Sequence, residues 1–318
     1  MKRKGWFIPI LVFVLSFSIL FLYQKFQNPV SLATTTEMTP ILWSKTATDI
    51  HKMIYSNGGK QIEVIRKNDK WVLSNLNNSY ADDLYIYSIL ENFTEPVFEK
   101  VVEMNPTNLP SYGIDENSQT LTLYDTENQE YTLIKGNARD TLTDYVYAPL
   151  SHTVYAMQNN TFGILKNNES DWRNKQLLTF DLSDVTQISF SYKSIQATLA
   201  PSIINQETIF TSPHINDSLA AEFVHFLQTS KIEQFIVDDA PVHVLDVYGF
   251  SKPLLQCTIN LKTGNTLSLT IGNINEEKNL FYAMVNNSNQ IVAIPFFDFS
   301  QFSALYAEYH ENGEEYLG

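Results

Sequence analysis

Leu109-Pro110-Ser111-Tyr112-Gly113-Ile114 returns 136 residues later as Leu245-Asp246-Val247-Tyr248-Gly249-Phe250. A second landmark keeps the same spacing, because Gly136 and Gly272 each end an alternating apolar stretch. Landmarks that recur in one order at a constant distance are the sequence signature of an internal repeat. The chain of 318 residues therefore contains two related units, joined near residues 166–179.

Each unit shows the same succession of patterns. Alternating residues on either side of a short turn, at Asn57-Gly58-Gly59 or Lys193-Ser194, predict an opening β-hairpin. A helix follows behind Asp82-Asp83 or Asn216-Asp217, and then a strand, the Tyr-Gly motif and an antiparallel meander. The apolar residues at helical spacing are Ile86, Ile89, Leu90 and Phe93, and Leu219, Phe223, Phe226 and Leu227. We therefore predict an α+β fold of two tandem units, each a mostly antiparallel sheet with one principal helix.

The N-terminal stretch predicts a membrane anchor. A basic cluster at residues 2–4 precedes residues 6–23, which carry no charge and are long enough to cross the hydrocarbon core at about 1.5 Å per residue. The basic cluster places the N-terminus in the cytoplasm and the body outside the membrane. A cleaved secretory signal, cut after Ala33, is the alternative.

These patterns divide the chain into five predicted regions. They are the basic cluster and anchor at residues 1–25, a polar stalk at 26–48, the first unit at 49–168, the second unit at 169–310 and an acidic tail at 311–318.

The charge balance excludes one class of partner. The chain has 35 acidic and 21 basic residues, which gives a net charge of −14. Four of the basic residues lie in the anchor region, which contains no acidic residue, so the exported part carries a net charge of −18. Nucleic-acid binding needs a basic face, so we expect no nucleic-acid partner. The single cysteine, Cys257, excludes an internal disulfide framework and a cysteine-rich metal site.

An ordered set of motifs in the body resembles a known family. The motifs in the first unit are Tyr112-Gly113-Ile114, Thr132-Leu133-Ile134-Lys135-Gly136, Asp144-Tyr145-Val146-Tyr147 and Val154-Tyr155, and the join carries an arginine and a leucine pair within Trp172–Asp181. This set resembles the bacterial family known as domain of unknown function 4340, over about residues 45–305. The second unit departs from the pattern at Phe250 and Val292-Ala293. The resemblance implies a membrane-anchored extracytoplasmic protein whose relatives are often encoded beside ABC-transporter genes, including those of the gliding-motility type, and it implies no reaction.

The motif residues are best explained by structure. Gly113 and Gly249 suit a turn with positive φ, and Gly136 and Gly272 suit a strand end. Tyr112 and Tyr248 are expected to pack on the sheet edge, although ligand stacking is the alternative. No catalytic, cofactor-binding or metal-binding residue is predicted. The weaker candidates are interpreted as solvated acids, loop residues and a packed thiol: Asp82-Asp83, Asp238-Asp239, His243 with Asp246, and Cys257.

The sequence thus favours a non-enzymatic, membrane-anchored accessory or interaction module of an ABC-transporter or cell-envelope complex. Its predicted partners are the bilayer, through residues 6–23, and a membrane-complex or transporter protein. Two alternatives stay open. One is an exported enzyme acting on polysaccharide or peptidoglycan, which two or more acids in one pocket would favour. The other is an extracytoplasmic ligand-binding or sensor module, which a cavity between the units would favour.

Overall fold

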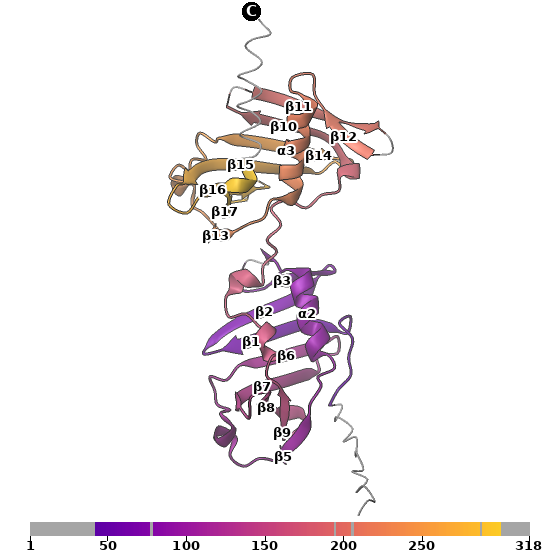
Figure 1. Cartoon of the computed structure of the whole chain (residues 1–318), viewed down its shortest axis with the longest axis vertical. Helices are drawn as coiled ribbons and strands as arrows, with labels where there is room; N and C mark the ends of the chain where they lie inside the picture. The colour runs from indigo at the N-terminus through magenta and orange to yellow at the C-terminus, as the bar shows by residue number, and fades with distance from the viewer. Residues whose placement is uncertain (1–41, 77–78, 194, 205–206, 287, 300–318) are drawn as a thin grey trace, which may run out of the picture.

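The computed structural model describes residues 42–299 except 77–78, 194, 205–206 and 287. Two units follow one another along the long axis of the molecule, each built on its own antiparallel sheet (Figure 1). The prediction of antiparallel sheets with few helices is therefore confirmed. The predicted membrane span at 6–23 and the acidic tail lie outside the described residues. Within the described part of the chain, no helix is long and apolar enough to cross a membrane.

The first sheet has nine strands in the order β4-β3-β2-β1-β6-β7-β8-β9-β5. The strands are β1 (Ile50–Asn57), β2 (Lys60–Lys67), β3 (Lys70–Leu73), β4 (Ser79–Tyr80), β5 (Lys100–Met104), β6 (Thr120–Asp125), β7 (Glu130–Ala138), β8 (Thr143–Ala148) and β9 (Thr153–Gln158).

The second sheet has eight strands in the order β12-β11-β10-β14-β15-β16-β17-β13. The strands are β10 (Val185–Tyr192), β11 (Ile195–Ile204), β12 (Glu207–Thr211), β13 (Gln234–Val237), β14 (Leu255–Leu261), β15 (Thr266–Asn275), β16 (Leu280–Val285) and β17 (Ile291–Pro295).

The two strand orders are the same once β4 is set aside, with β1 matching β10 and each later strand matching in turn. Three irregularities in the ladders also recur at matching places. They lie between Ile50/Lys52 and Val185/Gln187, between Lys135/Ala138 and Ile271/Ile274, and between Val101/Glu103 and Phe235/Val237. A β-bulge bends a strand and sharpens its twist, so both sheets curve in the same way.

One helix packs on each sheet, α2 (Asp83–Phe93) in the first unit and α3 (Asp217–Thr229) in the second. Asp82 and Asn216 cap them by accepting hydrogen bonds from the backbone N–H groups of Tyr85 and Leu219. The apolar helix residues expected from the sequence are buried in two separate cores. Each unit thus has its own core and its own helix, which accounts for the two copies of the strand and helix pattern in the sequence.

The Tyr-Gly motif forms a turn that lies directly on the meander, a 3₁₀ turn in the first unit and a turn after the 3₁₀ helix Val242–Val244 in the second. Gly113 ends the turn Leu109–Tyr112 at φ +73°, and Gly249 has φ +86°. A Cβ atom at Gly136 would overlap the backbone carbonyl oxygen of Tyr112, and one at Gly272 would overlap that of Tyr248. In each unit the two glycines therefore allow the same contact. The first, Gly113 or Gly249, lets the turn reverse, and the second, Gly136 in β7 or Gly272 in β15, lets the turn cross the strand more closely than a Cβ atom would permit.

The tyrosine of each motif packs on the strand beyond this crossing. Tyr112 meets Tyr145 of β8 edge to face with ring centroids 5.0 Å apart, and Tyr248 meets Tyr282 of β16 at 4.7 Å. Edge-to-face packing is a favoured arrangement of aromatic rings. The motif thus connects the turn to two successive strands of the meander.

A buried carboxylate fastens the start of the first unit to its sheet. Asp125, 3% exposed, accepts hydrogen bonds from Lys45 Nζ at 3.0 Å, from the Tyr131 hydroxyl at 2.9 Å and from the backbone of Glu127 and Gln129. Burial by itself raises the pKa of this carboxyl, but the hydrogen bonds, led by that from Lys45, outweigh it and lower the pKa from 3.8 to about 2.

We expect this carboxylate to make stability depend on acid pH. The folded-state pKa lies below the unfolded one, so the contribution is complete above about pH 4 and is lost as the pH falls through about 2. Asp125→Asn should lower the free energy of unfolding at pH 6 and flatten its slope between pH 5 and pH 2. Urea unfolding across that range measures both quantities, and an unchanged slope would contradict this account of Asp125.

Gly272→Ala should destabilise the protein by about 1–3 kcal/mol, because its methyl group would meet the Tyr248 carbonyl oxygen. Gly163→Ala is the matched control, since Gly163 does not have positive φ and a Cβ there meets nothing within 4 Å. The control should change stability by no more than about 0.5 kcal/mol. Equal effects of the two substitutions in urea unfolding would refute the close approach.

Candidate functional site

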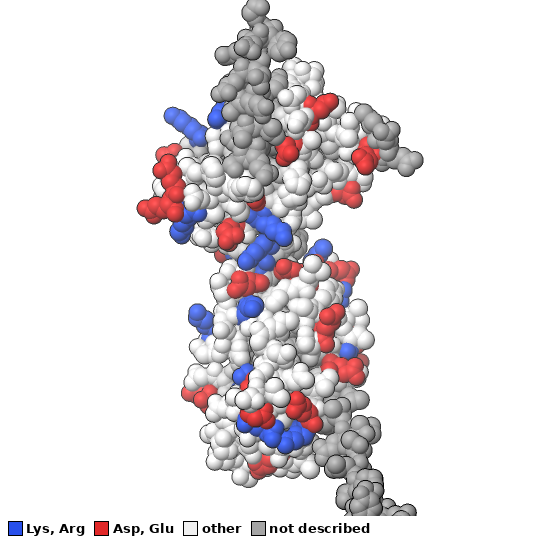
Figure 2. Space-filling model, viewed as in Figure 1, with Lys and Arg blue, Asp and Glu red and all other residues white. Residues whose placement is uncertain are grey.

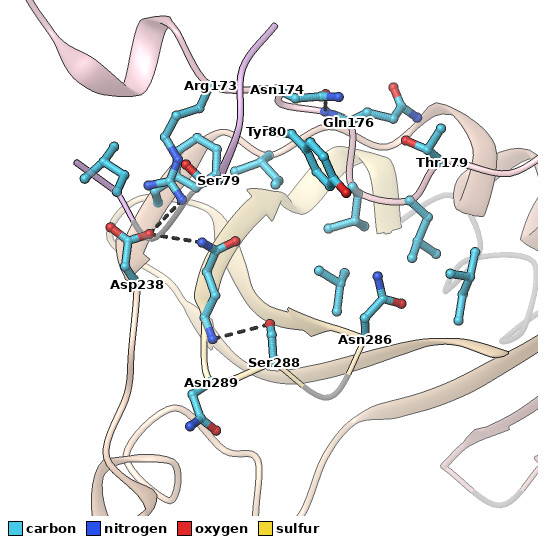
Figure 3. A pocket seen from close by; sticks show the side chains of 18 of the residues that line it. Ser79, Tyr80, Arg173, Asn174, Gln176, Thr179, Asp238, Asn286, Ser288 and Asn289 are labelled. Carbon is cyan, nitrogen blue, oxygen red and sulfur yellow. Dashed lines mark hydrogen bonds and ion pairs between the residues drawn. The ribbon is translucent and has the colours of Figure 1, made fainter. Parts of the chain in front are cut away.

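A cavity of about 700 Å³ lies between the two units (Figure 3). Its walls come from β4 and the loop before it in the first unit, from the join, and from strand ends and a loop of the second unit. The polar side chains labelled around it are those of Ser79, Tyr80, Arg173, Asn174, Gln176, Thr179, Asp238, Asn286, Ser288 and Asn289. Leu177, Leu178, Ile232, Phe235, Leu267 and Val285 are among the apolar lining residues.

The join crosses from one unit to the other within six residues. Asp82 donates its N–H to the carbonyl of Trp172 at 2.8 Å, and Asn174 donates to that of Tyr80 at 2.9 Å. Three residues further on, Leu177 donates to the carbonyl of Ser230 at 3.2 Å. The chain is therefore hydrogen-bonded to the first unit and then to the second, and only a short connection lies between them.

Arg173 is the charged residue at the centre of this crossing. It is 3% exposed, its Nη2 donates to Asp238 Oδ1 at 2.7 Å, and its guanidinium lies 3.5 Å from the centre of the Phe235 ring. The backbone of Arg173 pairs with Ala81 of the first unit, while Asp238 and Phe235 belong to the second. One side chain thus links the units by an ion pair and a cation–π contact.

The two acids in the cavity already have partners. Asp238 Oδ1 also accepts from Gln290 Nε2 at 3.0 Å, and Asp239 accepts from Asn289 Nδ2 at 3.4 Å. The cavity walls also carry amide and hydroxyl groups that can bind polar groups of a ligand, at Ser79, Asn174, Gln176, Thr179, Asn286 and Ser288.

Two buried polar atoms at the cavity wall have no hydrogen-bond partner among the described residues, Arg173 Nε and Ser79 Oγ. A buried donor without a partner costs about 1–3 kcal/mol relative to a satisfied one. Of the polar features of this cavity, these two atoms point most directly to a bound ligand or water.

The six motif residues predicted from the sequence lie elsewhere. Tyr112, Gly113 and Gly136 form the crossing in the first unit, and Tyr248, Gly249 and Gly272 form that in the second, while the cavity lining contains none of them. Tyr112 also donates its hydroxyl to Glu103, whose carboxylate raises the pKa of that tyrosine.

Of the weaker candidates, Asp238 and Asp239 line the cavity, whereas the others lie elsewhere. Asp82 caps α2 and Asp83 lies 3.5 Å from Lys70, while His243 and Asp246 are exposed. Within the described residues, no group of three His, Cys, Asp or Glu side chains could hold a metal ion. Cys257 is buried in β14, and burial raises the pKa of its thiol to about 12, so the thiol stays protonated.

Sequence reasoning missed two sets of residues. Arg173 stands in the arginine and leucine-pair segment of the join, but its partner Asp238 is 65 residues away and no local pattern connects them. Asn137 and Asn273 lie beside the two crossings, where a Cβ at Gly113 or Gly249 would meet their side chains. Their equal spacing of 136 residues is the signal that could have found them.

The family model described as Domain of unknown function (DUF4340) matches residues 71–243, more than half of the chain. The chain belongs to this family. The DUF4340 match runs from β3 to the loop before the second Tyr-Gly motif, so it contains the join, Arg173 and Asp238. No curated protein and no solved structure matches the chain.

Arg173→Ala should lower the free energy of unfolding by about 1–3 kcal/mol, because Asp238 loses its guanidinium and Phe235 its stacking partner. The same change should split one calorimetric transition into two, since this contact couples the units. Lys175→Ala is the control from the same join. Lys175 and Asp171 are 3.6 Å apart and both exposed, so its loss should cost at most about 0.5 kcal/mol and leave a single transition. If Arg173→Ala also leaves a single transition, the coupling role is wrong.

Proposed function

We propose that this protein is a non-enzymatic interaction module, tethered to the membrane by residues 6–23, with its two units outside the membrane. It would act as an accessory subunit of a transport or cell-envelope complex. We also infer that the two units are copies of one ancestral unit, because their strand orders and bulges match.

The observation that carries the proposal is the state of the charged groups in the cavity. Asp238 and Arg173 neutralise one another across the two units, and Asp239 is held by an amide. An ion pair of this kind holds the two lobes against one another. This favours a scaffold over an exported hydrolase.

Exposed sheet edges provide contact surfaces. β5 ends the first sheet, and Val101 and Met104 on it are exposed, as is Val97 just before it. Acidic side chains are scattered over both units on the face that Figure 2 shows, which suits a body that stands away from anionic lipid headgroups. Apolar side chains at an unpaired edge are a common basis for protein–protein contact.

Ligand binding in the cavity is the second candidate. A volume of about 700 Å³ falls in the range of small-molecule sites, and the unpartnered Arg173 Nε would favour a ligand with an acceptor oxygen. Such a module would still act without a reaction of its own.

The tether and the complex are tested together in the cells that produce the protein. The full chain should stay with the membranes after carbonate extraction and lose its body to protease added from outside, whereas a chain without residues 6–23 should be soluble. After chemical crosslinking and mild detergent extraction, the full chain should migrate with transporter or envelope subunits at fixed stoichiometry. A monodisperse protein recovered alone would overturn the proposal.

A further inference from the structure

The two units differ at one sheet edge. In the first unit β3 is covered by the short strand β4, with Val72 opposite Tyr80 and Leu73 opposite Ser79. In the second unit the matching strand, β12, is the last in its sheet. Apart from the isolated bridge between Ser212 and Ile215, the described residues place no further strand beside β12.

The backbone groups that β12 presents at this edge follow from its pairing. Pro201 lies opposite Phe210, and proline has no N–H, so this pair cannot exchange two hydrogen bonds. Because bonded and non-bonded pairs alternate in an antiparallel ladder, Ile209 bonds to β11 while Thr208 and Phe210 direct their N–H and C=O groups outward. Two donors and two acceptors thus stand along the free edge.

The first unit shows how such an edge is used. Trp71 occupies the position in β3 that Phe210 occupies in β12. The ladders place Trp71 opposite Arg66 and Phe210 opposite Pro201, and these two partners lie at matching positions of β2 and β11. The outward carbonyl of Trp71 accepts a hydrogen bond of 2.8 Å from the N–H of Ala81, directly after β4. The matching carbonyl of Phe210 has no such partner among the described residues.

An apolar groove of about 300 Å³ runs beside this edge, between β12 and α3. Its lining includes Ala221, whose counterpart in the first unit is Tyr87, since each lies five residues after the cap of its helix. Tyr87 packs against the first core. A large side chain fills this place in one unit, and a small one leaves it open in the other.

The charge around the groove selects the kind of occupant. The lining contains Asp217 and neither lysine nor arginine, and exposed Glu207 begins β12. A second copy of this chain, paired edge to edge through β12, would bring these acids together and be opposed by their repulsion. A strand with basic residues at its ends would be attracted.

We propose that the free edge of β12 takes up an extended segment of a partner protein. The segment pairs through the backbone with Thr208 and Phe210, places apolar side chains in the groove along Ala221 and Val224, and carries a basic residue near Asp217 or Glu207. This inference gives the proposed interaction module a contact surface, and so rests on that function.

A synthetic peptide tests the surface directly. The probe is acetyl-Lys-Val-Thr-Val-Thr-Val-Lys-amide, titrated against the whole protein with hydrogen exchange as the readout. Saturable binding should slow exchange of the Thr208 and Phe210 amides at least ten-fold and leave the Ile209 amide, already bonded to β11, unchanged. No saturable protection at about 1 mM peptide, the weakest affinity of interest, would overturn the proposal.

Variants of the protein separate the edge from the groove. Thr208→Pro removes an outward N–H and should weaken peptide binding at least ten-fold, whereas Thr208→Val keeps the N–H and should bind within about two-fold of the original. Ala221→Tyr copies the first unit, and because Ala221 is exposed the fold should tolerate it while the filled groove abolishes binding. Peptide binding that survives both Thr208→Pro and Ala221→Tyr would refute the surface.

Co-purification of these variants distinguishes this inference from the proposed function. If the subunits recovered with the original chain are lost from Ala221→Tyr and kept by Thr208→Val, both proposals hold. If the variant keeps them, the complex stands and this surface is wrong. If the peptide binds but the full chain is recovered alone from membranes, the surface stands and the proposed function fails.

Discussion

A single close contact organises each unit: the carbonyl of a tyrosine lies against the Cα of a glycine in the neighbouring strand. Gly136 under Tyr112 and Gly272 under Tyr248 let the turn rest directly on the meander. The turn then reverses through a residue at positive φ, and the tyrosine ring reaches the next strand. A Cβ atom at this glycine would push the turn away from the strand. The distance between the turn and the sheet, and with it the contact of the tyrosine ring with the next strand, therefore depends on the absence of one methyl group.

The second determinant is the shortness of the join. Backbone hydrogen bonds bind residue 174 to the first unit and residue 177 to the second, so the connection has little freedom to rotate. Arg173 adds a charged contact across it, buried on one side by its own unit and stacked on Phe235 of the other. The cavity between the two units therefore lies where Arg173 links them, and its polar walls are open to a small ligand.

Duplication also makes the differences between the units informative. The groove beside β12 is lined by Ala221, which stands where the first unit has Tyr87. A family match that includes both β3 and β12 places both edges in the shared part of the chain.

The sequence by itself determined the repeat, the antiparallel sheets, the helices and their buried faces, because strand alternation, helical spacing and caps are local properties of the chain. It also singled out the glycines, since Tyr112-Gly113 and Gly136 recur at one spacing. The tertiary structure alone decided that Tyr112 and Gly136 touch, that Arg173 reaches Asp238, and that β4 lies beside β3 while β12 is the last described strand of its sheet. These are contacts between residues brought together by chain crossing and sheet order, and no periodicity within a segment encodes which distant backbone will lie beside it.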